Sequence, residues 1–341
     1  MRVLTFGEIL LRLSSPGHTK LLQKDSLDAT FCGSEANVAV SLSKFGMDTK
    51  FLTKLPNSDL GNAAINSMRY FGVNTDKVIY GNGRMGLFYL EKGASQRPSK
   101  VIYDREYSAI AEAKPNEFNW KAIFQDIDWF HFSGITPALS KNMMETCLDA
   151  CKYAHNTGIT ISCDLNFRAK LWSSEKAQQT MKELVKYVDI CIANEEDADK
   201  VLGIKAIDSN VNIGQIDKNK YQIVAQEIVK QYGCKYVAIS LRESHSASDN
   251  GWSGMLYNSS SEECCFSKNY EIRIVDRLGG GDSFAAGIIF GLANKMKTQD
   301  IIEFGVAASC LKQTMEGDYN RASVDEVLDL VNSNGSGRIQ R

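Results

Sequence analysis

Three consecutive glycines followed by an aspartate, Gly279-Gly280-Gly281-Asp282, carry the clearest chemistry in this 341-residue sequence. Because glycine has no Cβ, the three N–H groups can converge on an anion, which the dipole of a following helix also favours. A carboxylate would repel that anion, so we interpret Asp282 as a base that takes the proton of a hydroxyl attacking a phosphoryl group, while the glycine amides stabilise the developing charge. The alternative is a flexible turn in which Asp282 caps the helix.

The glycine loop lies between a predicted strand, residues 271–275, and a predicted helix, residues 283–294. Within the helical run, apolar residues recur at helical spacing: Ala285, Ile288, Ile289 and Leu292. A packed helix would therefore anchor the loop.

A recurring order of elements predicts the fold class. Helical stretches end at glycine and are followed within a few residues by β-rich runs at 50–55, 76–80, 159–164 and 236–241. Two further apolar runs, 129–133 and 190–194, have the composition of strands buried on both faces. This alternation is typical of an α/β fold with a parallel sheet flanked by helices.

Polar residues end three of these strands: Asp164, Asn194 and Ser240. In open parallel sheets, ligands bind at the carboxyl ends of the strands, so we expect the site at this edge.

Two segments, 11–31 and 84–110, do not follow the alternation and have mixed polar and apolar patterns. We expect them to form a small separate sheet that covers the site as a lid and excludes water; the alternative is a pair of long surface loops. A small sheet with an apolar face gains from pairing with its copy, so we expect a homodimer through the lid. Residues 1–331 would form one domain, and residues 332–341 a flexible tail.

Composition excludes several classes of protein. The sequence is 43% hydrophobic and 23% charged, with a net charge of −2, which is typical of a globular chain and gives no electrostatic footprint for nucleic acid or a membrane surface. It lacks a signal peptide and any uninterrupted apolar run of ~18 residues, so we expect a cytoplasmic protein. Its nine cysteines favour buried thiols over disulfides. Cys147, Cys151 and His155 share a helix face, but their apolar neighbours favour core packing over metal binding.

Residues 276–287 resemble the C-terminal signature of the ribokinase-like (PfkB) sugar kinases, and residues 33–39 resemble that family's N-terminal glycine motif. The resemblance runs in the same order from Val3 to about Val331. It implies a ribokinase-like three-layer α/β sandwich with a small β-sheet lid, and ATP and Mg²⁺ as cofactors.

Within the family, residues 89–98, 103–105 and 164–168 are similar to 2-keto-3-deoxygluconate kinases. This resemblance implies ATP-dependent phosphorylation of the terminal hydroxyl of that sugar acid. The acid carries a carboxylate, which the guanidinium of Arg105 or Arg168 would match better than a lysine. Alternatively, each arginine forms a surface ion pair, or Arg168 contacts nucleotide phosphate.

The resemblance implies three sets of site residues. The catalytic set is Asp282, Gly279, Gly280, Gly281 and Arg168. The sugar-binding set is Gly33, Ser34, Asn37, Tyr89, Tyr103, Arg105, Asn166, Arg168, Asp282 and Asp318. The nucleotide-binding set is Asn166, Asn194, Ser240, Arg242, Gly279, Gly280 and Gly281.

Two departures from the family pattern leave roles open. The magnesium-associated Asn-x-x-Glu motif begins at Asn194 and ends in a shorter acid, so either Glu196 or Asp197 would order the ion through water. Arg242 stands where the family has glycine, and residues 243–254 form a polar insertion that puts the adenine-side contacts in doubt.

The same residues bear on three other functions. A kinase of fructose, ribose or tagatose 6-phosphate shares the same loop. A non-catalytic sugar-binding regulator would gain nothing from Asp282 beside phosphate. A Rossmann dehydrogenase is excluded because no Gly-x-Gly-x-x-Gly follows the first strand.

Overall fold

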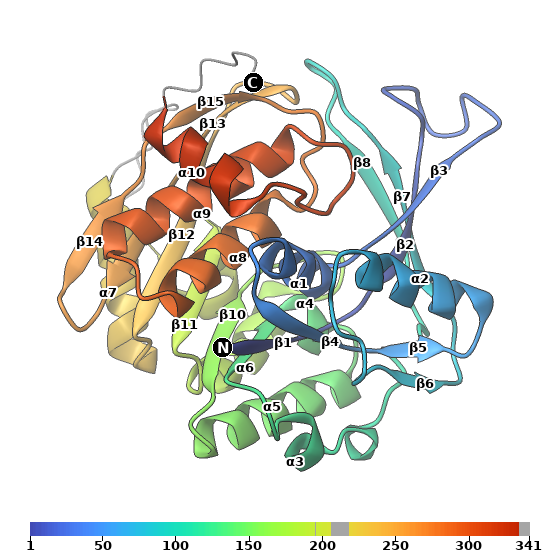
Figure 1. Cartoon of the computed structure of the whole chain (residues 1–341), viewed down its shortest axis with the longest axis horizontal. Helices are drawn as coiled ribbons and strands as arrows, with labels where there is room; N and C mark the ends of the chain where they lie inside the picture. Colours follow the sequence, from blue (N-terminus) through green and yellow to red (C-terminus); the bar gives the residue numbers. More distant parts are fainter. Residues whose placement is uncertain (195, 206–217, 334–341) are drawn as a thin grey trace.

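The computed structural model describes residues 1–194, 196–205 and 218–333 (Figure 1). In this part of the chain, the central sheet has nine strands in the order β14-β13-β12-β11-β10-β9-β1-β4, with β15 paired to β13. The strands are β1 (Arg2–Phe6), β4 (Asp48–Leu52), β9 (Trp129–Ser133), β10 (Thr160–Asp164), β11 (Ile190–Asn194), β12 (Tyr236–Ser244), β13 (Asp249–Asn258), β14 (Glu263–Phe266) and β15 (Tyr270–Arg273).

The six strands from β4 to β12 are parallel, and β13 to β15 extend the sheet with antiparallel pairing. The predicted α/β fold with a mostly parallel sheet is therefore confirmed. Residues 243–254, described above as a polar insertion, continue β12 and begin β13, which pair as a hairpin from Ser244 with Asn250 to Tyr236 with Asn258.

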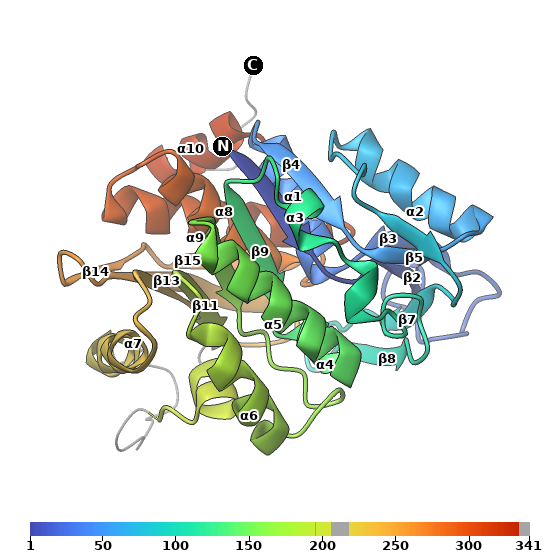
Figure 2. The same ribbon diagram turned by 90° about the horizontal axis from the view of Figure 1, so that it is seen from below.

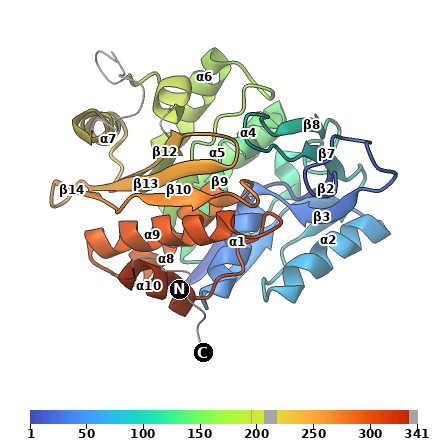
Figure 3. The same cartoon turned by 90° about the horizontal axis from the view of Figure 1, so that it is seen from above.

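Helices cover both faces of the sheet (Figure 3). One layer contains α1 (Ser34–Lys44), α8 (Gly280–Ala293), α9 (Thr298–Gln313) and α10 (Val324–Asn332). The opposite layer contains α5 (Lys141–Asn156), α6 (Ser174–Val185) and α7 (Lys218–Tyr232), with the short α3 (Trp120–Ile123) and α4 (Ile135–Ala138) beside α5 (Figure 2). Each layer buries its own apolar cluster against the sheet, which gives three layers in all.

A separate sheet has the strand order β3-β2-β7-β8 and lies at one side of the molecule (Figure 1). Its strands are β2 (Leu10–Ser14), β3 (Asp28–Cys32), β7 (Gly86–Glu91) and β8 (Lys100–Asp104). The expected small sheet is confirmed, and we call it the lid. It carries apolar residues inward, where Phe88, Leu90 and Tyr103 pack with Leu278 next to the glycine loop.

Two predicted strands of the central sheet are placed differently. The run 50–55 divides between β4 and the short β5 (Lys54–Pro56), and the run 76–80 contributes to β6 (Ile79–Gly81). These two short strands pair with each other in a third sheet, next to α2 (Asp59–Tyr70).

Other sequence expectations concern single segments. In α5, Cys147 and Cys151 are fully buried while His155 is exposed, so the three side chains do not converge. All nine cysteines are free thiols.

The predicted tail begins at Asn332, the last residue of α10, and from residue 334 lies outside the described residues. Among the described helices, none combines the length and apolar character that a membrane span requires.

Candidate active site

The glycine loop forms the N-terminus of α8. Gly279 precedes the helix with φ +80°, and a Cβ placed on it would lie 2.0 Å from the carbonyl oxygen of Asp318, so this position requires glycine. Around Gly281 there is open space, and no side chain caps the first turn of the helix. The amides at this helix start are therefore directed at a position where an anion can bind.

Asp282 is the third residue of α8 and is 9% exposed. Ser34 Oγ donates to its Oδ1 at 2.7 Å, and Asn37 Nδ2 donates to its Oδ2 at 2.6 Å. These contacts exclude the capping alternative, because the N-cap is Gly279 and the Asp282 carboxylate points to α1. Burial raises the pKa of Asp282, and the two hydrogen bonds and Arg168 partly oppose that rise.

Four buried charges hold the loop from behind. Arg12 of β2 forms ion pairs with Asp276, at 2.6 Å, and with Asp318, and all three side chains are less than 7% exposed. Lys312 of α9 is fully buried and donates to the carbonyl oxygen of Asp276 at 2.9 Å. Asp318, which the resemblance predicts to contact the sugar, is paired with Arg12 and does not line the cavity around the glycine loop.

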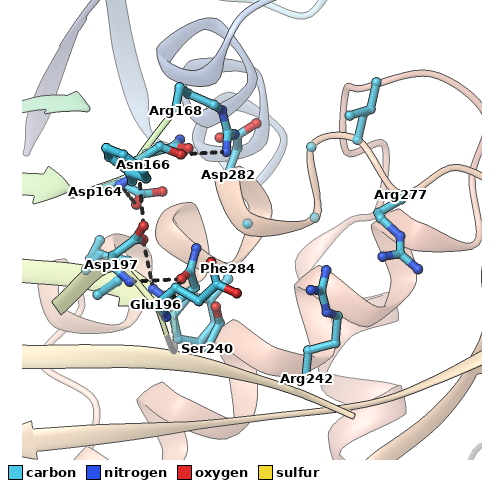
Figure 4. Close-up of a pocket in the computed structure, with 18 of the residues that line it drawn as sticks. Asp164, Asn166, Arg168, Glu196, Asp197, Ser240, Arg242, Arg277, Asp282 and Phe284 are labelled. Atoms are coloured by element: carbon cyan, nitrogen blue, oxygen red, sulfur yellow. Dashed lines mark hydrogen bonds between the residues drawn. The ribbon is translucent and has the colours of Figure 1, made fainter. Parts of the chain in front are cut away.

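Residues that follow β10 form the opposite wall of the site. Asn166 has a φ of +38° and donates through Nδ2 to Ser34 Oγ at 3.1 Å. The Arg168 side chain is exposed and lies next to the Asp282 carboxylate (Figure 4). Asp164, which ends β10, is buried, and burial together with Asp197 and Asp282 raises its pKa well above the ordinary value.

A cavity of about 480 Å³ joins these elements at the carboxyl ends of the parallel strands, as expected. Twelve predicted site residues line it: Tyr103, Asn166, Arg168, Asn194, Glu196, Asp197, Ser240, Arg242, Gly279, Gly280, Gly281 and Asp282. Gly33 does not line it, while Ser34 and Asn37 adjoin it through their bonds to Asp282.

The structure separates the two acids proposed to order magnesium. Asp197 is 2% exposed, and its oxygens accept the backbone N–H groups of Phe167 and Asn194, both at 3.0 Å. It therefore braces two strand ends. Glu196 is exposed and lines the cavity, so it is the acid that fits a water-mediated contact with a metal ion.

Two predicted sugar contacts lie apart from the cavity. The register of the lid pairs Tyr103 with Phe88, so Tyr89, the next residue along β7, lies on the opposite, outer face of the lid. Tyr89 is accordingly not among the residues that line the cavity. Arg105 is 7% exposed, and its Nε donates to Glu8 Oε2 at 2.8 Å in a buried ion pair. Sequence reasoning did not identify Glu8, the buried partner of Arg105.

Other residues of the cavity were missed as well: Asp164, Trp252, Arg277 and Phe284. Asp164 was recognised as a strand end but not assigned a role. Arg277 stands two residues before Gly279, and a basic residue so close to an anion-binding loop was a signal that could have identified it.

The chain matches known proteins along most of its length. A family model described as pfkB family carbohydrate kinase matches residues 2–324. The chain is 32% identical to a 2-dehydro-3-deoxygalactonokinase of Haloferax volcanii, over 98% of each chain, and 26% identical to a 2-dehydro-3-deoxygluconokinase of Bacillus subtilis, over 95% of this chain and 93% of the other. The crystal structure of a 2-dehydro-3-deoxygluconokinase from Thermotoga maritima is 49% identical and has a TM-score of 0.93, covering 98% of this chain and 100% of that one.

Proposed function

We propose that this chain, which belongs to the pfkB family of carbohydrate kinases, is an ATP-dependent sugar-acid kinase that phosphorylates the terminal hydroxyl of 2-keto-3-deoxygluconate, also called 2-dehydro-3-deoxygluconate. The observation that carries the chemistry is the placement of a buried carboxylate, Asp282, in the first turn of the helix whose free amides face the same cavity. The substrate follows from the 49% identity to the Thermotoga maritima enzyme.

In this mechanism the sugar hydroxyl lies between Asp282 and the phosphoryl group to be transferred. Asp282 accepts the hydroxyl proton as the oxygen attacks phosphorus. Ser34 and Asn37 fix the carboxylate in place, and the amides at the start of α8 bind the equatorial oxygens of the transferred group. Arg168, next to Asp282, neutralises charge on that group.

Mg²⁺ would enter with the nucleotide and neutralise charge on its phosphates. Glu196 is the acid available to hold it through water, since both oxygens of Asp197 accept backbone N–H groups.

We assign the sugar carboxylate to Arg105. The carboxylate and the terminal hydroxyl lie at opposite ends of a six-carbon chain, and Arg168 is beside the hydroxyl end, next to Asp282. Arg105 does not itself line the cavity; it directly follows β8 of the lid and stands two residues after Tyr103, which does line the cavity. Its Nε and Nη2 face Glu8, and a guanidinium has five N–H donors, so donors remain for a ligand.

The outer face of the lid supports a homodimer. Leu13, Tyr89 and Ile102 are paired across β2, β7 and β8 and therefore share this face, and Ile102 is 41% exposed. A second copy of the chain would cover them by a twofold contact.

Nine free thiols agree with a reducing compartment, and we assign the reaction to the cytoplasm.

ADP release with a panel of substrates tests the function: 2-keto-3-deoxygluconate, its galactonate epimer, fructose, ribose and tagatose 6-phosphate. We expect the highest kcat/KM with 2-keto-3-deoxygluconate. Preference for the epimer would keep the sugar-acid kinase and change its substrate, whereas preference for a neutral or phosphorylated sugar would refute the carboxylate assignment.

The variant Arg105→Leu tests the carboxylate contact. We expect KM for the acid sugar to rise, because the carboxylate loses a charged partner; the rise corresponds to a loss of about 2–5 kcal/mol in binding free energy. KM for ATP should be unchanged. The double variant Glu8→Leu/Arg105→Leu removes both charges, so that no unpaired acid is left buried, and should show the same KM. Arg84→Leu, which breaks an exposed lid ion pair with Asp104, is the control.

A further inference from the structure

Charges in the cavity are divided between its two sides (Figure 4). Asp164, Asp197 and Asp282 gather on one side, with Arg168 beside them. Arg242 and Arg277 lie on the other side of the glycine loop, and their guanidinium groups point toward each other. A ligand that fits this cavity therefore presents its anionic part to the two arginines.

Arg277 is half-buried, and its chain neighbours fix its position. Asp276 before it is anchored by Arg12 and Lys312, and Leu278 after it packs under the lid. The side chain of Arg277 is thus attached to a rigid backbone, and its guanidinium projects into the cavity rather than into bulk solvent.

Its protein partners do not balance its charge. The guanidinium donates to Asn250 Oδ1 at 3.4 Å, a neutral acceptor at the limit of hydrogen bonding. Among the described residues, no carboxylate lies within 4.0 Å of it, whereas six other arginines have such an ion pair: Arg2, Arg12, Arg84, Arg97, Arg105 and Arg273. None of these six lines the cavity. Burial and the like charge of Arg242 lower the pKa of Arg277. A half-buried guanidinium that has no carboxylate partner and lies near a like charge is stabilised when an anion binds to it.

The direction of phosphoryl transfer identifies that anion. In an in-line displacement the attacking and leaving oxygens lie on opposite sides of the transferred phosphorus. The attacking hydroxyl is at Asp282, so the leaving nucleoside diphosphate must extend from the glycine loop to the side away from Asp282. Arg277 and Arg242 are on that side.

We propose that Arg277 binds the phosphates of the leaving nucleoside diphosphate and stabilises the negative charge that they gain during transfer. The proposal rests on the kinase function proposed above. It adds Arg277 to the residues that contact the nucleotide phosphates. A guanidinium suits this role because its planar fork binds two phosphate oxygens at once.

Equilibrium binding without sugar and without turnover tests the proposal. Isothermal titration of ADP with Mg²⁺, of inorganic tripolyphosphate and of adenosine is compared for the wild type, Arg277→Leu and Arg277→Lys. We expect Arg277→Leu to weaken ADP and tripolyphosphate roughly tenfold to a hundredfold and adenosine by less than threefold, since a hydrogen bond to a charged group is lost. Arg277→Lys should recover part of the affinity because it keeps the charge.

Arg273→Leu is the matched control, since this arginine is on the preceding strand with a side chain that is 83% exposed. It should bind all three ligands like the wild type. Thermal unfolding of every variant checks the fold, and Arg277→Lys keeps the test open if Arg277→Leu unfolds.

Three results would overturn the proposal: ADP affinity unchanged in Arg277→Leu, an equal loss for adenosine and ADP, or a wild type that binds no ADP. Turnover of 2-keto-3-deoxygluconate is measured separately. Its absence would refute the proposed substrate, while the ADP titrations would still decide the role of Arg277.

Discussion

Asp282→Asn separates the chemical role of Asp282 from its structural role. Both carboxylate oxygens accept hydrogen bonds, from Ser34 Oγ at 2.7 Å and from Asn37 Nδ2 at 2.6 Å. In the variant, the amide oxygen can still accept from Asn37, and the amide NH₂ can donate to Ser34 Oγ, because a hydroxyl rotates to accept. Asn37 keeps its acceptor and Ser34 keeps a hydrogen bond to residue 282, so we expect the fold and the affinities for sugar and nucleotide to be kept.

The turnover number kcat of Asp282→Asn should fall strongly, in contrast to these affinities. Loss of a general base costs typically ~10²–10⁴ in rate, or about 3–5 kcal/mol of activation free energy at 1.36 kcal/mol per decade. Coupled ADP release gives kcat and KM, and titration calorimetry gives the affinities. Asp300→Asn, the same exchange at an exposed position in the first turn of α9, is the control. A kcat of Asp282→Asn within tenfold of the wild type would refute the base.

The pH profile gives an independent measure of the same residue. The base must be ionised to accept a proton, so kcat/KM of the wild type rises with pH through the pKa of Asp282 in the free enzyme. Burial raises that pKa, and the acid limb therefore lies above the ordinary range of aspartate. Arg168 lowers it, so Arg168→Leu should move the limb to higher pH. A limb that is unchanged in Asp282→Asn would assign it to another group.

Much of the fold could be predicted because its signals are local. Helices that end at glycine, apolar strands and the glycine loop are each encoded within a few residues, and β9 and β11 have the predicted bounds. The sequence was less informative where pairing with a neighbouring strand determines the local structure. Residues 243–254 are polar, yet they form part of a hairpin because β12 continues past the parallel sheet and pairs with β13.

The site was predictable in residue type but not in pairing. Arg105 was assigned to the sugar from its residue type and its resemblance, and Asp318 from its resemblance alone. The structure gives each a charged partner far away in the sequence, Glu8 at 97 positions and Arg12 at 306. Tyr89 was assigned from its resemblance, and only the register of the lid reveals that it faces outward. A buried charge is defined by the partner that neutralises it, and long-range pairing is what a single sequence does not specify.

Gly279→Ala should lower nucleotide affinity and kcat together, because its φ is +80° and a Cβ would meet Asp318 O at 2.0 Å; Gly158→Ala, at φ +75° with no atom within 4 Å of the Cβ, is the control. Arg12→Leu should lower the free energy of unfolding in urea by about 3–5 kcal/mol, since two buried aspartates lose their partner. Leu13→Asp should convert a dimer into a monomer in light scattering at micromolar concentration. Its side chain is on the outer face of the lid, where a twofold contact would bury the new charge against its own copy or a neighbouring apolar residue. The turnover number kcat per chain should change little, because the residues that line the cavity belong to one chain. If the wild type is a monomer at this concentration, the proposed dimer through the lid is refuted.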